Sequence, residues 1–198
     1  MSHVDKKLIQ KLRDITGLGL MDCRKALEEA KGDIEGAVEL LRRKGASVAA
    51  KRADKETAEG LIVAYIHPGS QIGVLVEINT ETDFVARTED VRQFAHDLCL
   101  HITAMKPLYL VPEDVDSAFV DREKTIFKEQ IASSGKPEKI VNQIVEGKIN
   151  KFYDEICLLN QPFIKDDEMT VSDVLNQIIG KTGEKIKIKR FSRFEIGC

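Results

Sequence analysis

The chain of 198 residues lacks the sequence signatures of the common enzyme classes. It has no GxxxxGK(S/T) loop to hold a phosphate, no GxGxxG after a strand and no HExxH helix for zinc. Its histidines and cysteines show no metal-ligand spacing, and no serine or cysteine stands in a recognisable nucleophile turn. The absences agree with one another, so we predict a protein that works by binding, with no catalytic residue, metal ion or cofactor.

Other scarcities indicate a compartment and limit the partners. No stretch approaches the ~18 apolar residues of a spanning helix, and the charged start MSHVDKKLIQKLRD has no apolar signal segment. The four cysteines lie far apart with no CxxC pair, and the simplest interpretation is that they are free thiols of a cytosolic protein. Lys and Arg number 30 against 33 Asp and Glu, a net charge of -3 that disfavours a broad nucleic-acid face. We expect a cytoplasmic protein with no membrane contact and no direct nucleic-acid contact.

What the sequence does contain is helical periodicity in residues 1–45. The predicted helices are 4–15, 21–30 and 33–45, and the first is predicted to end at Thr16 and Gly17. Val4, Leu8, Leu12 and Ile15 form the apolar stripe of the first helix. Asp22 and Asp33 are the predicted N-caps of the second and third helices, and Gly45 is the predicted end of the third. Residues 46–59, rich in Ala, Lys and Glu, predict a solvated helical connector.

Residues 60–198 predict the larger part of an α+β protein, a small, mostly antiparallel sheet packed by helices. Predicted strands are 61–66, 72–79 and 184–196, and in the second of them Ile72, Val74, Val76 and Ile78 alternate and face one way. Predicted helices are 89–105, 114–157 with breaks at 133–137 and Gly147, and a last one from Thr170 or Ser172 to about Ile179. Residues 158–170 lack a clear period, so we expect an irregular crossing there.

The stretch INTETDFVAR, residues 78–87, places an acid and a large ring side by side where a strand ends and a helix begins. In one interpretation Thr82 or Asp83 begins the helical turn and Phe84 folds back into the core, which composition alone favours. In the other, Phe84 protrudes as an interface anchor, and Asp83 contacts a cation or an amide of a partner.

The stretch RDITGLGLMDC, residues 13–23, carries Leu18, Leu20 and Met21 in a glycine-rich turn between two helices. These side chains either close the small bundle or form an exposed apolar patch on a docking module. The sequence does not choose between the two.

His101 lies on the apolar stripe of the 89–105 helix, between Leu98 and Met105. We predict a partly buried histidine with satisfied hydrogen bonds rather than a base or a metal ligand. The cysteines are predicted to be small apolar core residues.

Several segments, in this order, resemble the elongation factor Ts family: LRDITGLGLMDCRKALEEAKGDIEGAVELLRRKG, NTETDFVAR, SGKPEKIVNQIVEGKINKFY, LLNQPFIKDDEMTV and RFSRFEIG. The resemblance runs from about residue 5 to residue 197. It implies a guanine-nucleotide exchange factor for elongation factor Tu rather than an enzyme. It also implies an N-terminal three-helix domain similar to ubiquitin-associated (UBA) domains, followed by an α+β core.

The resemblance further implies roles for two groups of residues. The TDFV motif of the family dislocates the magnesium ion at the nucleotide site of elongation factor Tu, and here it is Thr82, Asp83, Phe84 and Val85. The positions that dock on the GTP-binding domain are matched by Arg13, Leu20 and Met21. The leucine replaces a methionine that is common at its position.

The chain has a single core, like the short form of the family, which acts as a homodimer. An apolar strand at its end is an edge that invites pairing. Some short relatives have a cysteine that bridges the dimer where this chain has Ser192, and Cys198 lies six residues further on. We therefore expect a homodimer, and the position of Cys198 counts against an intermolecular disulfide without deciding the question.

Two rival hypotheses belong to other classes of protein. A ubiquitin-type adaptor would bind its partner through residues 4–44 alone and would give Asp83 and Phe84 no role. An RNA- or ribosome-associated protein would use the basic segments RRKGASVAAKR and KIKIKRFSR, against which the net charge of -3 counts.

Overall fold

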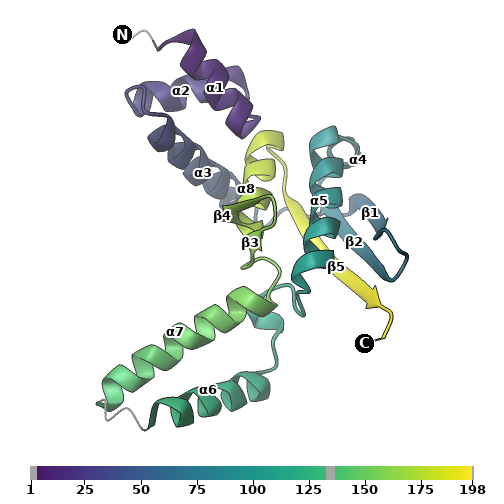
Figure 1. Cartoon of the computed structure of the whole chain (residues 1–198). Coiled ribbons are helices and arrows are strands. Elements are labelled where there is room, and N and C mark those ends of the chain that lie inside the picture. Colours follow the sequence, from purple (N-terminus) through teal and green to yellow (C-terminus); the bar gives the residue numbers. More distant parts are fainter. Residues whose placement is uncertain (1–3, 133–136, 198) are drawn as a thin grey trace. The chain divides into compact units, whose positions relative to one another are not determined.

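The computed structural model describes residues 4–132 and 137–197 and has the predicted α+β architecture (Figure 1). The elements are α1 (Lys6–Thr16), α2 (Leu20–Glu29), α3 (Ile34–Lys51), β1 (Glu59–Ile66), β2 (Ile72–Thr80), α4 (Asp83–Ala86), α5 (Glu89–Met105), the 3-10 turn η1 (Pro112–Asp114), α6 (Ser117–Ala132), α7 (Glu138–Ile156), β3 (Pro162–Phe163), β4 (Asp166–Thr170), α8 (Val171–Thr182) and β5 (Ile186–Glu195). Among the described helices, none has the length and apolar character needed to cross a membrane.

The chain divides into two compact units. The first is Met1–Ile62, Glu77–Ala95 and Asp173–Lys189, and the second is Val63–Val76, His96–Ser172 and Arg190–Cys198. The predicted division into residues 1–45, 46–59 and 60–198 uses continuous ranges, whereas each of these units combines segments that are distant in sequence. The predicted division stays a prediction.

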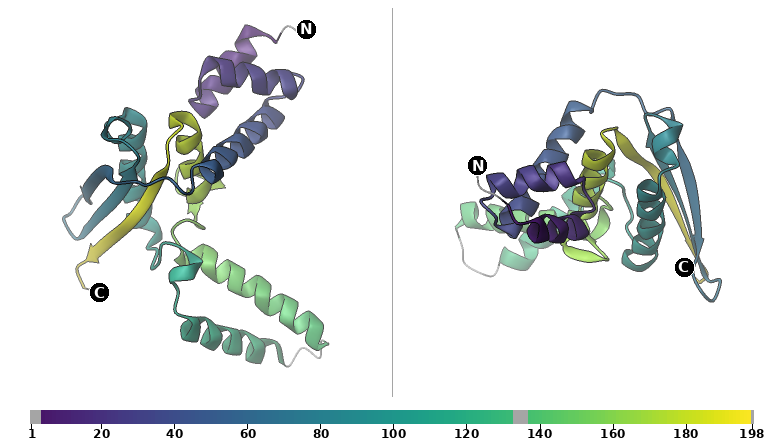
Figure 2. Two further views of the ribbon diagram at one scale, coloured as in Figure 1. Left: turned by 180° about the vertical axis from the view of Figure 1, so that it is seen from behind. Right: turned by 90° about the horizontal axis from the view of Figure 1, so that it is seen from above.

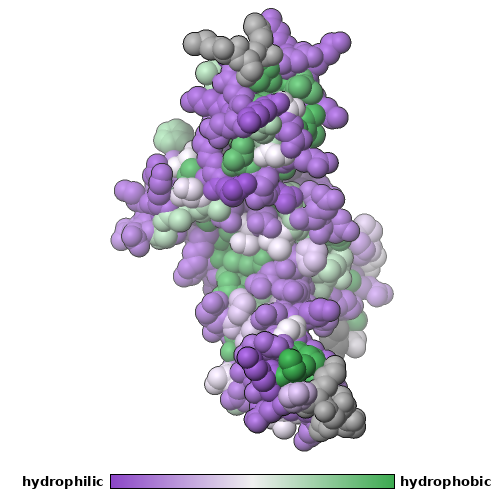
Figure 3. Space-filling model, turned by 90° about the vertical axis from the view of Figure 1, so that its left-hand side faces the viewer, coloured by the Kyte–Doolittle hydropathy of each residue, from purple (hydrophilic) through white to green (hydrophobic). Residues whose placement is uncertain are grey.

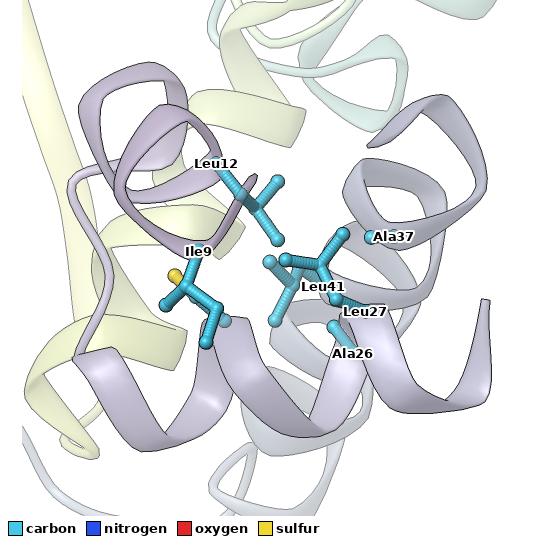
Figure 4. Packing of buried hydrophobic residues seen from close by; sticks show 7 residues of the cluster. Ile9, Leu12, Ala26, Leu27, Ala37 and Leu41 are labelled. Carbon is cyan, nitrogen blue, oxygen red and sulfur yellow. The ribbon is translucent and has the colours of Figure 1, made fainter. Parts of the chain in front are cut away.

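Helices α1 to α3 form the predicted three-helix bundle at the start of the first unit. Asp5 caps α1 by accepting from the Lys7 N–H at 2.9 Å, and Gly17, at φ 65°, ends it. Asp33 caps α3 as predicted. The buried side chains that converge between the helices (Figure 4) include Ile9, Leu12, Ala26, Leu27, Ala37 and Leu41.

Asp22 is not the cap of α2, contrary to the prediction. Gly19 occupies the cap position, and Asp22 lies in the first turn, where a carboxylate suits the positive end of the helix dipole. Its oxygen also accepts from the Lys44 ammonium at 2.5 Å, which joins α2 to α3.

Gly45 does not end α3, which continues to Lys51 through the first residues of the predicted connector. The glycine is buried, and a Cβ built on it would lie 2.7 Å from the carbonyl oxygen of Asn176 in α8. A Cβ on Gly180 would lie 3.0 Å from the Gly45 Cα. Gly45 is therefore a contact residue between two helix backbones, and the signal that usually ends a helix has a packing role here.

The three-stranded sheet has the order β1-β2-β5 and is antiparallel, as predicted (Figure 2). His67 N–H donates to the Ile72 carbonyl at 2.9 Å and closes the β1–β2 hairpin. Val74, Val76 and Ile78 of β2 are buried, in agreement with the predicted alternation. Met105, predicted on the buried stripe of α5, is exposed because the helix ends there.

In the second unit, α6 and α7 lie side by side as a helix pair with a hydrophobic cluster of its own (Figure 1). α7 runs through Gly147 without the predicted break, because the glycine is exposed and nothing opposes it. Most of the predicted break at 133–137 lies outside the described residues. The predicted irregular crossing at 158–170 is instead largely a short antiparallel hairpin of β3 and β4.

Candidate partner-binding site

The TDFV motif forms a single capped turn at the end of β2. Thr82 is the N-cap of α4, and its hydroxyl oxygen accepts from the Val85 N–H at 3.4 Å. The carbonyl of Thr82 accepts in turn from the Thr80 hydroxyl at 2.7 Å. Ala86 is the buried residue of this turn, so the four-residue helix packs on the rest of the protein through a small side chain.

Phe84 protrudes from this turn, with 79% of the residue exposed. Of the two interpretations left open by the sequence, the folded-back ring is wrong and the protruding ring is correct, while the cap at Thr82 holds in either case. Ala86 is the buried residue of this four-residue helix, and the ring of Phe84 does not fill the core. An exposed aromatic on a fixed turn is a ready interface anchor.

Asp83 is paired within the motif. Its carboxylate lies 2.8 Å from Arg87 Nη2, and both side chains keep substantial exposure, 41% and 71%. The pair fixes the direction of the carboxylate beside the ring. Arg87 is not among the residues predicted from the sequence, although its i,i+4 spacing from Asp83 indicates an ion pair on a helix.

The turn is held from outside by residues far along the chain. Thr82 N–H and its hydroxyl both donate to the Glu184 carboxylate, at 3.1 Å and 2.9 Å. The neighbouring Glu81 accepts from the Lys185 N–H at 2.6 Å and from Arg52 at 3.0 Å. No sequence pattern indicated this, because 102 residues separate Thr82 from Glu184.

The predicted docking residues Arg13, Leu20 and Met21 are exposed, and Leu20 and Met21 keep 52% and 59% of their surface. Ile15 is also exposed, at 56%, although the helical stripe predicted it inside the bundle. Leu18 is half-buried and packs on the bundle core. The turn therefore does both things that the sequence left open, closing the bundle with Leu18 and exposing the other side chains.

These exposed residues flank the turn between α1 and α2. Figure 3 shows hydrophobic side chains among hydrophilic ones on the N-terminal helices, drawn at the top. The structure thus brings the predicted docking residues to one end of the bundle, and Ile15 belongs with them.

His101 is fully buried, and both ring nitrogens have partners. Nδ1 accepts from the Ile164 N–H at 3.2 Å, so Nε2 carries the proton that is shared with Gln161 Oε1 at 2.9 Å. Burial lowers the pKa of this imidazole from 6.5, against the opposing effect of the Gln161 hydrogen bond. The prediction of a satisfied histidine is confirmed, and its burial is complete rather than partial.

The described cysteines Cys23, Cys99 and Cys157 are free and buried, as predicted for core residues. Burial raises the pKa of the Cys99 thiol to about 11. Burial, with nearby carboxylates, raises the pKa of Cys157 to about 11 as well. Cys198 lies outside the described residues, and in the described part of the chain no three His, Cys, Asp or Glu side chains gather as a metal site.

Exposed apolar side chains beside the α1–α2 turn and an exposed aromatic ring on a capped turn are typical of a protein that binds other proteins. The family model described as Elongation factor TS matches residues 33–198. Proteins named Elongation factor Ts align with nearly the whole chain: that of Desulforamulus reducens is 51% identical over 197 residues (100% of this chain, 91% of the relative), that of Thermotoga maritima 52% over 195 (98% and 97%) and that of Moorella thermoacetica 53% over 189 (96% and 93%).

The chain belongs to the elongation factor Ts family. It is accordingly a translation elongation factor, an exchange factor for guanine nucleotide on elongation factor Tu, and elongation factor Tu is its partner.

Proposed function

We propose that this chain releases GDP from elongation factor Tu by dislocating the magnesium ion at the nucleotide site with its TDFV turn, Thr82–Val85. The observation that carries the proposal is Phe84, a large ring 79% exposed on a turn whose backbone is already capped. An exposed ring on an ordered turn loses little freedom on insertion, because its support is built before the partner arrives.

The chemistry of the partner explains why such a ring is sufficient. In a P-loop GTPase the magnesium ion bridges the phosphates and protein oxygens, and it holds part of the affinity for GDP. Phe84, inserted between elements of the partner, shifts the groups around that ion. Asp83, directed by Arg87 at 2.8 Å, adds a polar contact that stabilises the shifted state.

The energies are of the right size. Full burial of a phenylalanine side chain contributes about 1.5–3 kcal/mol. Each tenfold loss of GDP affinity needs about 1.4 kcal/mol of differential contact. Because linkage is reciprocal, a factor that binds the nucleotide-free partner better than the GDP-bound partner must weaken GDP binding by the same free energy. No covalent step is needed, so the chain acts by binding and is not an enzyme.

Docking on the partner and insertion of Phe84 use different surfaces of the chain. Arg13, Leu20 and Met21, with Ile15 beside them, supply exposed apolar area and one cation for the GTP-binding domain of the partner. This contact holds the factor on its target whether or not the ring is inserted. It therefore contributes affinity, while Phe84 contributes the change at the nucleotide site.

The factor is further proposed to be a cytoplasmic homodimer. In the second unit, exposed Ile66, Phe194 and Ile196 line a groove together with Gly73. Strand β5 is an edge of the sheet, since the order is β1-β2-β5. A Phe194→Asp variant should sediment as a monomer at concentrations where the native chain is a dimer. A monomeric native chain would refute the dimer.

The decisive experiment is the release of a fluorescent GDP from bacterial elongation factor Tu, with the native chain, Phe84→Ala and Asp83→Ala. We expect strong acceleration by the native chain and its loss in Phe84→Ala, with binding retained through the N-terminal module. No acceleration at micromolar native chain would refute the function. If Phe84→Ala accelerates release as much as the native chain does, the exchange function stands and the proposed insertion of Phe84 is refuted.

A further inference from the structure

The loop after α8 is shaped to meet the TDFV turn. Gly183, at φ 72°, ends α8, and its N–H donates to the Ile179 carbonyl at 2.8 Å. A side chain at this φ would be strained, so glycine permits the abrupt change of direction. The next two residues, Glu184 and Lys185, then lie against Thr82 and Glu81.

The contact between Glu184 and Thr82 is more specific than a surface pairing. An ionised carboxylate only accepts hydrogen bonds, and here it receives both donors of one residue. Thr82 N–H lies 3.1 Å from Oε2, and the hydroxyl lies 2.9 Å and 3.0 Å from the two oxygens. Hydrogen bonds to a charged acceptor are the stronger kind.

This geometry decides which way the Thr82 hydroxyl points. Its proton is directed at Glu184, so a lone pair of the same oxygen is free to accept from the Val85 N–H at 3.4 Å. The three groups form a chain from Val85 through Thr82 to Glu184, in which each bond polarises the next. The N-cap of α4 is thereby set by a carboxylate 102 residues away in sequence.

A second set of contacts ties the same loop to the end of the N-terminal bundle. The Lys185 ammonium donates to the carbonyls of Ala53 and Lys55 at 2.5 Å and 2.8 Å, just beyond α3. Arg52 reaches Glu81 at 3.0 Å. These residues all belong to the first compact unit. The turn that carries Phe84 is thus fixed on two sides, and Glu184 is the member that touches its cap.

We propose that Glu184 is a positioning residue for exchange: its carboxylate orders the Thr82 cap and holds Phe84 in its protruding direction before elongation factor Tu arrives. The proposal rests on the proposed function of the TDFV turn. It assigns Glu184 to the rate of nucleotide release and not to docking, since the docking residues Leu20 and Met21 lie elsewhere on the first unit. A disordered turn would still reach the partner but would have to be ordered there.

The test measures fluorescent GDP release over a range of factor concentrations, which separates the maximal rate from the half-saturating concentration. For Glu184→Ala we expect the maximal rate to fall roughly tenfold or more, since a charge-assisted bond to the cap is lost. The half-saturating concentration should stay within about twofold, because docking is intact.

Conservative variants and a matched control make the result specific. Glu184→Gln keeps an acceptor oxygen for Thr82 and should restore most of the rate, whereas Glu184→Asp is one methylene too short and should not. Asp97→Ala is the control, because Asp97 is also a carboxylate shielded from solvent, 2.6 Å from Lys165 Nζ, and it is not among the residues proposed for docking, exchange or dimerisation. It should lose stability without the selective fall in maximal rate.

A second measurement does not depend on the partner. Amide hydrogen exchange of the free chain should show faster exchange at Val85 in Glu184→Ala and near-native exchange in Glu184→Gln. If Glu184→Ala does not fold, the Gln, Asp and Thr82→Val variants decide the question by the same readouts.

The outcomes separate the two proposals. No acceleration by the native chain refutes the proposed function. Acceleration by the native chain that is lost in Phe84→Ala but kept in Glu184→Ala refutes the role of Glu184 alone. A fall in rate for Glu184→Ala that Gln does not restore, or one matched by Asp97→Ala, reduces Glu184 to a stabilising residue and overturns the proposal.

Discussion

Replacing Gly45 by alanine should destabilise the chain, although glycine to alanine inside a helix ordinarily stabilises it. The usual gain is about 0.5–1 kcal/mol, because alanine has less backbone freedom to lose on folding. At Gly45 the new methyl group would lie 2.7 Å from the Asn176 carbonyl oxygen and 3.2 Å from its carbon. These are backbone atoms of α8, so no side-chain rotation relieves the contact.

The size of the effect follows from two opposed quantities. Overpacking of a tight contact costs about 1–3 kcal/mol, which exceeds the gain in backbone entropy. The net loss in unfolding free energy for Gly45→Ala should therefore be about 0.5–2 kcal/mol. A displaced α8 also moves Gly183 and Glu184, so the rate of GDP release should fall along with stability.

Gly147→Ala is the matched control. Gly147 lies within α7 and is exposed, and beyond the backbone of its own helix no heavy atom of the described residues lies within 4 Å of the new methyl group. It should gain about 0.5–1 kcal/mol. Urea unfolding followed by circular dichroism gives both values on one scale. A Gly45→Ala variant as stable as Gly147→Ala, or more so, would show that the α3–α8 contact yields freely and would refute the reasoning.

Three further expectations concern titrating and charged groups. Burial lowers the pKa of His101 from 6.5, so below pH 6.5 the unfolded chain binds a proton that the native chain does not, and the unfolding free energy falls as pH falls. Urea unfolding between about pH 7 and pH 5 should show a smaller fall in unfolding free energy for His101→Gln than for the native chain. Cys99 and Cys157, buried and with pKa about 11, should resist a thiol reagent at about pH 8 until the chain is unfolded, as peptide mass spectrometry would show, and fast labelling of the native chain would contradict their burial. Arg87→Ala removes an exposed pair with Asp83 and should change the unfolding free energy by no more than about 0.5 kcal/mol, a larger loss indicating a structural role for the pair.

The sequence predicted those parts of the fold that depend on neighbours along the chain. The Asp33 cap, the Gly17 end of α1 and the alternation in β2 are local signals, and the structure confirms them. The same local rules predict a helix end at Gly45 and a break at Gly147, and both predictions are wrong, because a glycine ends a helix only where no tertiary contact or continued hydrogen bonding overrides it. The difference between the two glycines is a contact across the fold.

In the candidate site, too, the sequence predicts the features that depend on neighbouring residues and does not predict those that depend on contacts across the fold. The cap at Thr82 could be predicted from residue type and position, and the resemblance to a family supplied Phe84 as a candidate. The direction of the ring depends on which residue of a four-residue helix faces inward, and composition could not supply that. Glu184 carried no sequence signal, because its contact with Thr82 spans 102 residues.

That span has a consequence for the order in which the molecule is made. The three-helix bundle closes through neighbours in sequence, so a chain emerging N-terminus first can form it early. The cap of the TDFV turn waits for a residue made 102 positions later, and closing so long a loop is slow. During synthesis, the bundle that carries the proposed docking residues is complete before the turn proposed to act on the nucleotide site is fixed. With the roles proposed for these two surfaces, a nascent factor would bind elongation factor Tu before it could promote nucleotide exchange.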